Sequence, residues 1–375
     1  MTNEKEHDEY QLGPIDVKRT GRSLRVSSRW DPPEHKEFLE RIRIERPNIK
    51  KKVDDCIHEL LEIVRIYDPL KLIAPISVVN LTMDPETYSE ATHRGDESIV
   101  EYLLSAITST SPSTSMNEPS ADIIQKTIDI LKQIKQMTII YYGMEMAEGR
   151  YDQKEAELRF RIMLHSLGVR GPSYPQHVRQ TFLELFQPHD SFLTKNFGLS
   201  SKQIFELAEG ILHSVESITN ESRQALYPLI EPYKKFVQYQ QKHPSLEHED
   251  LVKRFKAKYG DLPDKQNEEK IRNYLQDLGG PAIFQIRPEY LEKGEFIRAI
   301  SLKPSENDIF VNVKNHAAWF LNPSRIFERP ILHVGNNFYC FSPTILLRNL
   351  GFIVEKLIES KDRDYLRTFY NSRDK

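Results

Sequence analysis

The sequence contains few cysteines, no long apolar run and no large excess of charge. Only two of its 375 residues, Cys56 and Cys340, are cysteines. This excludes a disulfide framework or a multi-cysteine zinc module and indicates a reducing cytoplasm. No stretch approaches the roughly 20 apolar residues of a membrane span, and residues 1–10 lack the apolar core of a signal peptide. The net charge of −3 gives no general attraction to nucleic acid or membrane. We therefore expect a soluble, cytoplasmic protein.

Sequence motifs of common enzyme and metal sites are also missing. The chain has no P-loop, no dinucleotide-binding glycine pattern and no nucleophile elbow. His177, His189 and His213 lack the i,i+4 pairing or the cysteine partners that make a metal site specific. Residues 263–270 imitate the acidic elements of a restriction-type nuclease, but their short separation and a helical pattern from Glu268 exclude two neighbouring strands. We expect no catalytic residue, metal or cofactor.

Helical periodicity is the main feature that the sequence does have. Ile57, Leu60 and Val64 lie on one side of a predicted helix, and similar stripes recur through most of the chain. Short β-like runs follow residue 299, and Gly335-Asn336-Asn337 predicts a hairpin loop. The expected fold class is mostly α, with one or more multi-helix domains and a small C-terminal α+β unit that contains a β-hairpin.

Capping residues and prolines predict where several helices begin and end. Asp68-Pro69 is typical of an N-cap followed by proline at the first helical position. Pro47 is expected to end or restart a helix, and Ser200 or Ser201 to cap another. Pro228 and Pro232 are expected near the start of a further helix.

Changes in composition divide the chain into five expected parts. The clearest boundary is a run of Ser and Thr around residues 108–115, which cannot form a core. The expected parts are a flexible tail (1–33), an N-terminal helical block (34–107), a Ser/Thr-rich linker (108–119), a central helical domain (120–282) and a small α+β unit with a closing helix (283–375).

The turn at residues 168–177 supplies the main candidate binding residues. Its two glycines and two prolines fix the path between predicted helices. Arg170, Tyr174 and His177 are then the polar side chains expected to be held in a fixed place. They serve either to tie the corner together or to bind a partner, and the sequence favours the first interpretation over the second.

Two basic segments are candidate contacts to nucleic acid. The first is N-terminal, and the second interleaves basic and aromatic residues, a pattern that suits phosphates and stacked bases. The alternative is that both segments are only solvated, with Leu251, Val252, Phe255 and Tyr259 forming an inward stripe in the second. The candidate residues are Lys18, Arg19, Arg22, Arg25, Lys253, Arg254 and Lys256.

Several short phrases carry a family resemblance. They include Tyr67-Asp68-Pro69, residues 84–88, the Tyr174-Pro175-x-His177 turn, Phe197-Gly198-Leu199 and the segment from Arg329-Pro330 to Pro343. In these the chain resembles the helical N-terminal region of uncharacterised bacterial multidomain proteins that carry a restriction-endonuclease-like domain C-terminally. The resemblance implies that the chain corresponds to the helical region without the catalytic part.

These observations favour a non-catalytic, helix-rich interaction or regulatory module with a protein partner. The resemblance implies an association with a bacterial nuclease or defence system. Two alternatives stay open: an accessory protein that binds nucleic acid, and an enzyme whose site is assembled from residues distant in sequence.

Overall fold

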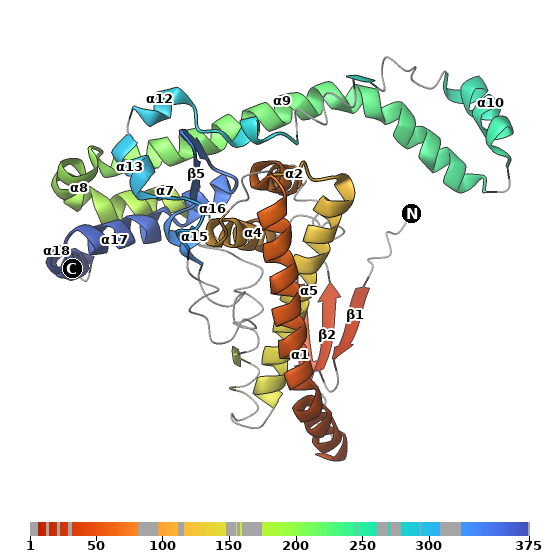
Figure 1. The fold of residues 1–375 in the computed structure, drawn as a ribbon, viewed down its shortest axis with the longest axis horizontal. Coiled ribbons are helices and arrows are strands. Elements are labelled where there is room, and N and C mark those ends of the chain that lie inside the picture. The colour runs from red at the N-terminus through yellow and green to blue at the C-terminus, as the bar shows by residue number, and fades with distance from the viewer. Residues whose placement is uncertain are drawn as a thin grey trace.

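In the computed structural model, a body of packed helices carries a long helical arm that extends away from it (Figure 1). Most of the described residues are helical, and the strands form two small three-stranded sheets. The expected mostly α fold class is therefore confirmed. The structure describes residues 7–12, 15–20, 23–28, 32–81, 97–111, 116–147, 155, 158–159, 175–244, 246–260, 269–270, 279–292, 294–307 and 324–373.

The N-terminal segment forms an antiparallel sheet where the sequence analysis expects an irregular, flexible tail. Its strands are β1 (His7–Leu12), β2 (Ile15–Thr20) and β3 (Ser23–Ser28), in the order β1-β2-β3. Two residues separate each pair of strands, and each pair of connecting residues includes a glycine. Apolar and polar residues alternate in β2 and β3, as strands favour. This period of two was missed because the segment is short and rich in charge.

The first helical core joins α1 (Pro32–Ile66), α2 (Pro69–Leu81), α4 (Glu97–Ser109) and α5 (Ala121–Ala147). Helices α1 and α5 lie side by side (Figure 1). The predicted stripe of Ile57, Leu60 and Val64 is buried against this core. Pro47 lies inside α1, so the prediction that it ends or restarts a helix is wrong. The proline removes one backbone hydrogen bond, but the bonds of the neighbouring turns are enough to keep the 35-residue helix continuous.

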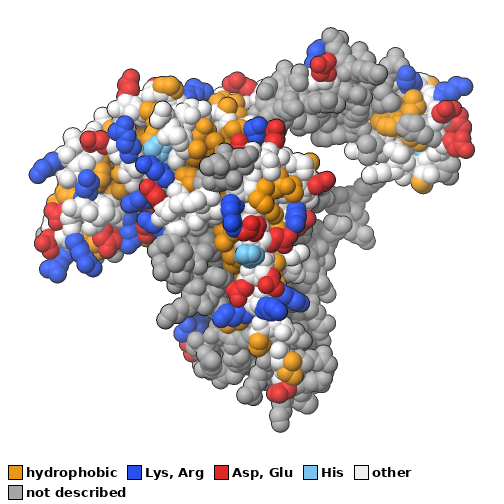
Figure 2. All heavy atoms as spheres, viewed as in Figure 1, with side chains coloured by type: hydrophobic (Ala, Val, Ile, Leu, Met, Phe, Trp, Pro, Cys, Tyr) orange, Lys and Arg blue, Asp and Glu red, His pale blue; other side chains and the backbone are white. Residues whose placement is uncertain are grey.

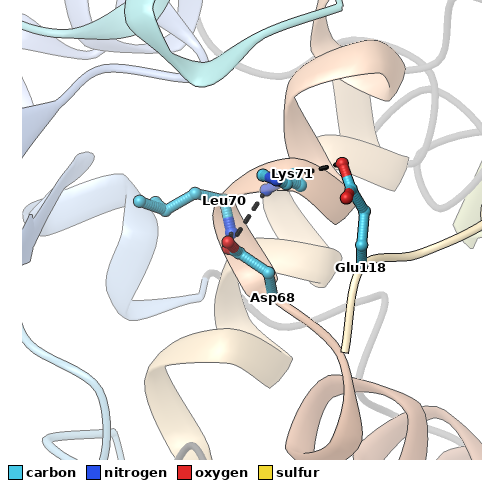
Figure 3. A network of polar contacts seen from close by, with 4 residues as sticks. All are labelled: Asp68, Leu70, Lys71 and Glu118. Atoms are coloured by element: carbon cyan, nitrogen blue, oxygen red, sulfur yellow. Dashed lines mark hydrogen bonds and ion pairs between the residues drawn. The ribbon is translucent and has the colours of Figure 1, made fainter. Parts of the chain in front are cut away.

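A local network fixes the start of α2, as Figure 3 shows. The Asp68 carboxylate accepts hydrogen bonds from the backbone N–H groups of Leu70 (2.9 Å) and Lys71 (3.3 Å), which confirms the predicted N-cap. The Lys71 ammonium pairs with Glu118 at 2.9 Å. The Asp68 N–H also donates to the Asn117 carbonyl at 2.9 Å. The segment before α5 is thereby fastened to the corner between α1 and α2.

The second core is built from helices that lie far apart in sequence. Its buried residues include Phe186, Leu193 and Ile204 from the middle of the chain, and Ile353 and Phe369 from its end. Gly351 lies on the same side, with Phe186 3.6 Å from the position of an added Cβ. The contributing helices include α7 (Pro175–Phe186), α8 (Asp190–Phe197), α9 (Ser201–Lys242), α16 (Pro343–Arg348), α17 (Leu350–Lys361) and α18 (Arg363–Arg373), and η2 (Gln187–His189) connects α7 to α8.

Helix α9 is one continuous helix where the sequence analysis expects two. Ser200 caps it, because its hydroxyl accepts from the Gln203 N–H while the Gln203 side chain accepts from the Ser200 N–H. Gly198 precedes this cap with φ of 72°, a conformation that glycine adopts without strain. Pro228 and Pro232 lie inside the helix rather than near a helix start. The other backbone hydrogen bonds of this 42-residue helix compensate for the two that the prolines cannot donate.

A mixed sheet closes the body near the C-terminus. Strand β5 (Ile331–Val334) pairs in parallel with β4 (Ser301–Leu302) and antiparallel with β6 (Asn337–Tyr339). The predicted hairpin is confirmed, but its loop has two residues rather than the three expected at 335–337, because Asn337 begins β6 and pairs with Val334. Gly335 has φ of 61° in this turn. The remaining short helices are η3 (Pro281–Phe284), α12 (Pro288–Leu291), α13 (Gly294–Ala299) and α15 (Arg325–Glu328).

The C-terminal sheet packs on the N-terminal helices. Leu332 and Phe341 belong to the first core, together with residues of α1 and α4. The Asn307 side chain donates to the hydroxyl of Thr108 at 3.2 Å, and Arg348 pairs with Glu97. Thr108 is buried at the end of α4, although the sequence analysis places it in an exposed linker. Its hydroxyl bonds the Leu104 carbonyl at 2.9 Å, so the helix satisfies this polar residue.

Candidate functional site

The outer half of α9 and the helix α10 (His248–Tyr259) form an arm, defined here as residues 227–260. Figure 1 shows α10 at the end of α9 that is remote from the body. At about 1.5 Å per residue, the 42 residues of α9 span roughly 60 Å. Among the α9 side chains that the structure describes, Leu226 is the last that joins the first core. Beyond this point the arm presents its surface away from the rest of the protein.

A small aromatic cluster holds α10 against α9. Phe255 is 1% exposed, and its ring centroid lies 5.1 Å from Phe236, 5.7 Å from Tyr239 and 5.0 Å from Tyr259. We call these four residues the tip cluster. Leu251 is also buried, which confirms two members of the predicted inward stripe. Tyr259 is 50% exposed, however, because it is the last residue of α10 and lies at the rim of the cluster.

Basic side chains cover the outward side of α10. Lys253, Arg254, Lys256 and Lys258 are all exposed, and we call these four residues the basic face. The Lys258 ammonium lies 5.0 Å from the ring centroid of Tyr259, a cation–π contact. Figure 2 shows Lys and Arg side chains beside an apolar patch at the end of the arm, with Asp and Glu on its outer edge. The arrangement can attract a polyanion and offer it an aromatic surface.

The other predicted contact residues are only partly described. Arg170, Tyr174 and Arg22 lie outside the described residues. His177 lies in the first turn of α7 and is exposed, so its proposed role in binding stays a prediction. Lys18, Arg19 and Arg25 lie in β2 and β3, where only the backbone is described, and Lys18 pairs directly with Arg25 in the strand register. The structure thus describes the side chains of only four predicted contact residues: His177, Lys253, Arg254 and Lys256.

A polar cluster around a buried histidine, which the sequence did not indicate, lies at the C-terminal end of the body. His189 is 3% exposed, with its Nδ1 2.9 Å from the Tyr365 hydroxyl and its Nε2 2.8 Å from Ser372 Oγ. Ser372 Oγ donates to the Phe369 carbonyl at 2.7 Å, so it accepts from Nε2. The Tyr365 hydroxyl then donates to Nδ1. The partners of His189 lie more than 170 residues away along the chain, and no local pattern indicates them.

Burial determines the protonation state of this cluster. It lowers the pKa of His189 below its usual value and raises the pKa of the Tyr365 phenol. Both groups are therefore neutral near pH 7. Because the Ser372 hydroxyl proton is donated to a backbone carbonyl, it is not directed at the histidine as in a Ser–His nucleophile. The contacts of His189 with Tyr365 and Ser372 anchor α18 to the body.

The described part of the chain holds neither a metal-binding cluster nor a membrane-spanning helix. No three His, Cys, Asp or Glu side chains there come together as a metal site, and His177, His189 and His213 do not converge. Within the same residues, no helix is both long and apolar enough to cross a membrane. The comparisons with known proteins also add no candidate, since no family model, curated protein or solved structure matches the chain.

Proposed function

We propose that this chain is a non-catalytic, helix-rich interaction or regulatory module that contacts its partner through the arm. The observation that carries the proposal is the position of α10, at the end of a helix of 42 residues and remote from the body (Figure 1). Its fold is maintained there by the tip cluster, while its outward side contributes to neither core. A structure of this shape makes a charged surface accessible to a large partner.

The body supports this proposal through what its polar residues do. His189, Asp68 and Ser200 all bind other parts of the same chain at 3.3 Å or less. These contacts cap helices and fasten segments, which accounts for their burial or fixed geometry. The resemblance to helical regions that precede nuclease domains is a second argument for a non-catalytic role of the chain in a nuclease or defence system.

Site-specific photocrosslinking tests the proposal. A benzophenone amino acid in place of Lys258 would be compared with the same group in place of Lys361, an exposed residue of α17 in the body. Irradiation in cells of the source organism should give a discrete adduct from the arm position at several times the yield from the body position. Equal yields from both positions, or adducts from the body alone, would contradict the proposal.

A further inference from the structure

The basic face concentrates positive charge in a chain that is negative as a whole. The arm, residues 227–260, contains seven Lys and Arg against four Asp and Glu, whereas the net charge of the whole chain is −3. The rest of the sequence is therefore clearly acidic. Exposed charges at the end of an arm act on ligands within about 8–10 Å at physiological salt. The arm thus attracts a polyanion locally, although the protein as a whole would repel one.

Helix stability accounts for only part of this charge pattern. Glu249 and Asp250 in the first turn and the lysines of the last turn follow the order that the helix dipole favours. Lys253 and Arg254 lie in the middle of α10, where this effect is weak. They follow the two acids by four residues, yet no ion pair joins these four described side chains. Their charges therefore stay directed toward solvent.

Tyr259 adds a feature that charge alone would not require. Half of its surface is exposed, while its ring is held by Phe255 and Tyr239 at centroid distances of 5.0 and 5.9 Å. The Lys258 ammonium lies beside the same ring. A fixed, exposed aromatic ring next to a cation suits a stacked base and its phosphate, which is the combination that single-strand-binding proteins use.

We infer that the basic face of α10 binds the phosphate backbone of a single-stranded nucleic acid, with Tyr259 as the platform for a base. The inference rests on the proposed function, because it assigns a partner to the same arm. A single strand fits better than a duplex because its bases are free to stack. It also fits better than an acidic protein, whose carboxylates would leave the exposed ring of Tyr259 unused.

Fluorescence anisotropy with a labelled oligothymidylate of about 20 nucleotides tests this inference. The test variant carries Lys253→Gln, Arg254→Gln and Lys256→Gln in the full chain. The control carries Lys195→Gln, Lys361→Gln and Arg367→Gln, which removes the same charge from exposed residues of the body. Circular dichroism and hydrogen exchange of α10 confirm that each variant is folded.

The wild-type protein should bind the oligonucleotide with an affinity that falls as salt is raised. Loss of three phosphate contacts should reduce the slope of log K against log salt by about 2 and weaken binding at least about tenfold at low salt. The control should change the affinity less than threefold. Since a tenfold change in affinity corresponds to about 1.4 kcal/mol, this is less than about 0.6 kcal/mol of binding free energy. Tyr259→Leu, which keeps an apolar side chain in the tip cluster, should weaken binding without changing the salt slope.

Several outcomes would overturn the inference. These are absence of binding at low salt, equal losses in the test and control variants, and equal competition by polyglutamate. Equal binding of a duplex, with no effect of Tyr259→Leu, would overturn the single-strand assignment. If the oligonucleotide does not bind but the Lys258 position still gives a nuclease-resistant adduct, only this inference fails. Loss of both signals would refute the proposed function as well.

Discussion

Two helices of nearly equal length, α10 and α18, are attached to the molecule in different ways. Helix α18 buries Phe369 against Phe186, where the ring centroids lie 5.1 Å apart, and its Tyr365 and Ser372 form hydrogen bonds with His189. Helix α10 rests on the tip cluster and leaves four basic side chains exposed. The comparison shows that α18 is part of the second core of the body, whereas α10 has a small core of its own. The exposed basic surface and the large buried core are thus located at different places.

The largest effect is expected from Phe369→Ala. This side chain is 1% exposed and contacts both Phe186 and His189. Its removal should lower the free energy of unfolding by about 3–5 kcal/mol, because it leaves a cavity in the second core. Urea denaturation followed by circular dichroism measures this loss. A change below about 1 kcal/mol would show that α18 is peripheral to the fold and that the comparison with α10 fails.

Phe255→Ala should have a large effect that stays local. Phe255 is as deeply buried as Phe369, but its aromatic neighbours belong to the arm alone. Hydrogen exchange in residues 248–259 should accelerate strongly, while the midpoint of global unfolding changes little. Mass spectrometry of deuterium uptake measures both regions in one sample. If the global midpoint falls as far as in Phe369→Ala, the arm is coupled to the body and has no separate core.

A smaller effect is expected from the pH dependence of His189. Burial lowers the pKa of His189 in the folded state below the value of about 6.5 in the unfolded chain. Between these two values the unfolded chain binds more protons. The stabilisation by the neutral ring is therefore complete above about pH 6.5 and is lost as pH falls through that value toward the folded-state pKa.

His189→Gln should weaken this pH dependence. The free energy of unfolding would be measured at about pH 7.5 and pH 5.5, on either side of the ordinary histidine pKa. The wild-type protein should lose more stability on acidification than the variant does. His213→Gln serves as the control, because His213 is exposed on α9. The explanation is wrong if both variants retain the full wild-type pH dependence.

The smallest effect is expected from Ser200→Ala. The change removes the hydrogen bond that the Ser200 hydroxyl accepts from the Gln203 N–H at the start of α9. It should lower the free energy of unfolding by about 1 kcal/mol. Since this end of α9 lies in the body, exchange in α10 should be unchanged while the global midpoint falls slightly. A selective loss of protection in α10 would instead indicate that the ends of α9 are coupled over its whole length.

Local patterns in the sequence predicted much of the fold. The cap at Asp68, the capping residue Ser200 and the hairpin at Gly335 each depend on a few neighbouring residues, and the structure confirms all three. The inward positions of Leu251 and Phe255 follow from helical spacing alone. The exposure of the basic face follows from the same spacing. In each case the physical cause acts within about one helical turn or one strand pair.

Features that depend on distant partners could not be predicted in this way. Pro47 and Pro228 were expected at helix ends, but both lie inside helices. These helices are long, and the hydrogen bonds and packing of their other turns maintain them past the prolines. The role of His189 depends on Tyr365 and Ser372, which lie 176 and 183 residues later in the sequence and contact His189 only in the folded protein. Thr108 was expected in an exposed linker because a Ser/Thr run gives no sign of its distant partner Asn307.

The closing of the C-terminal sheet on the N-terminal helices has a consequence for synthesis of the protein. Glu97 pairs with a residue 251 positions later, and Thr108 binds one 199 positions later. At a translation rate of about 5–20 residues per second, α4 waits roughly 10–50 s for its partners to be made. During that interval the first core lacks its late members, such as Leu332 and Phe341. The nascent chain is therefore expected to need shielding by a chaperone until the residues around Arg348 have left the ribosome.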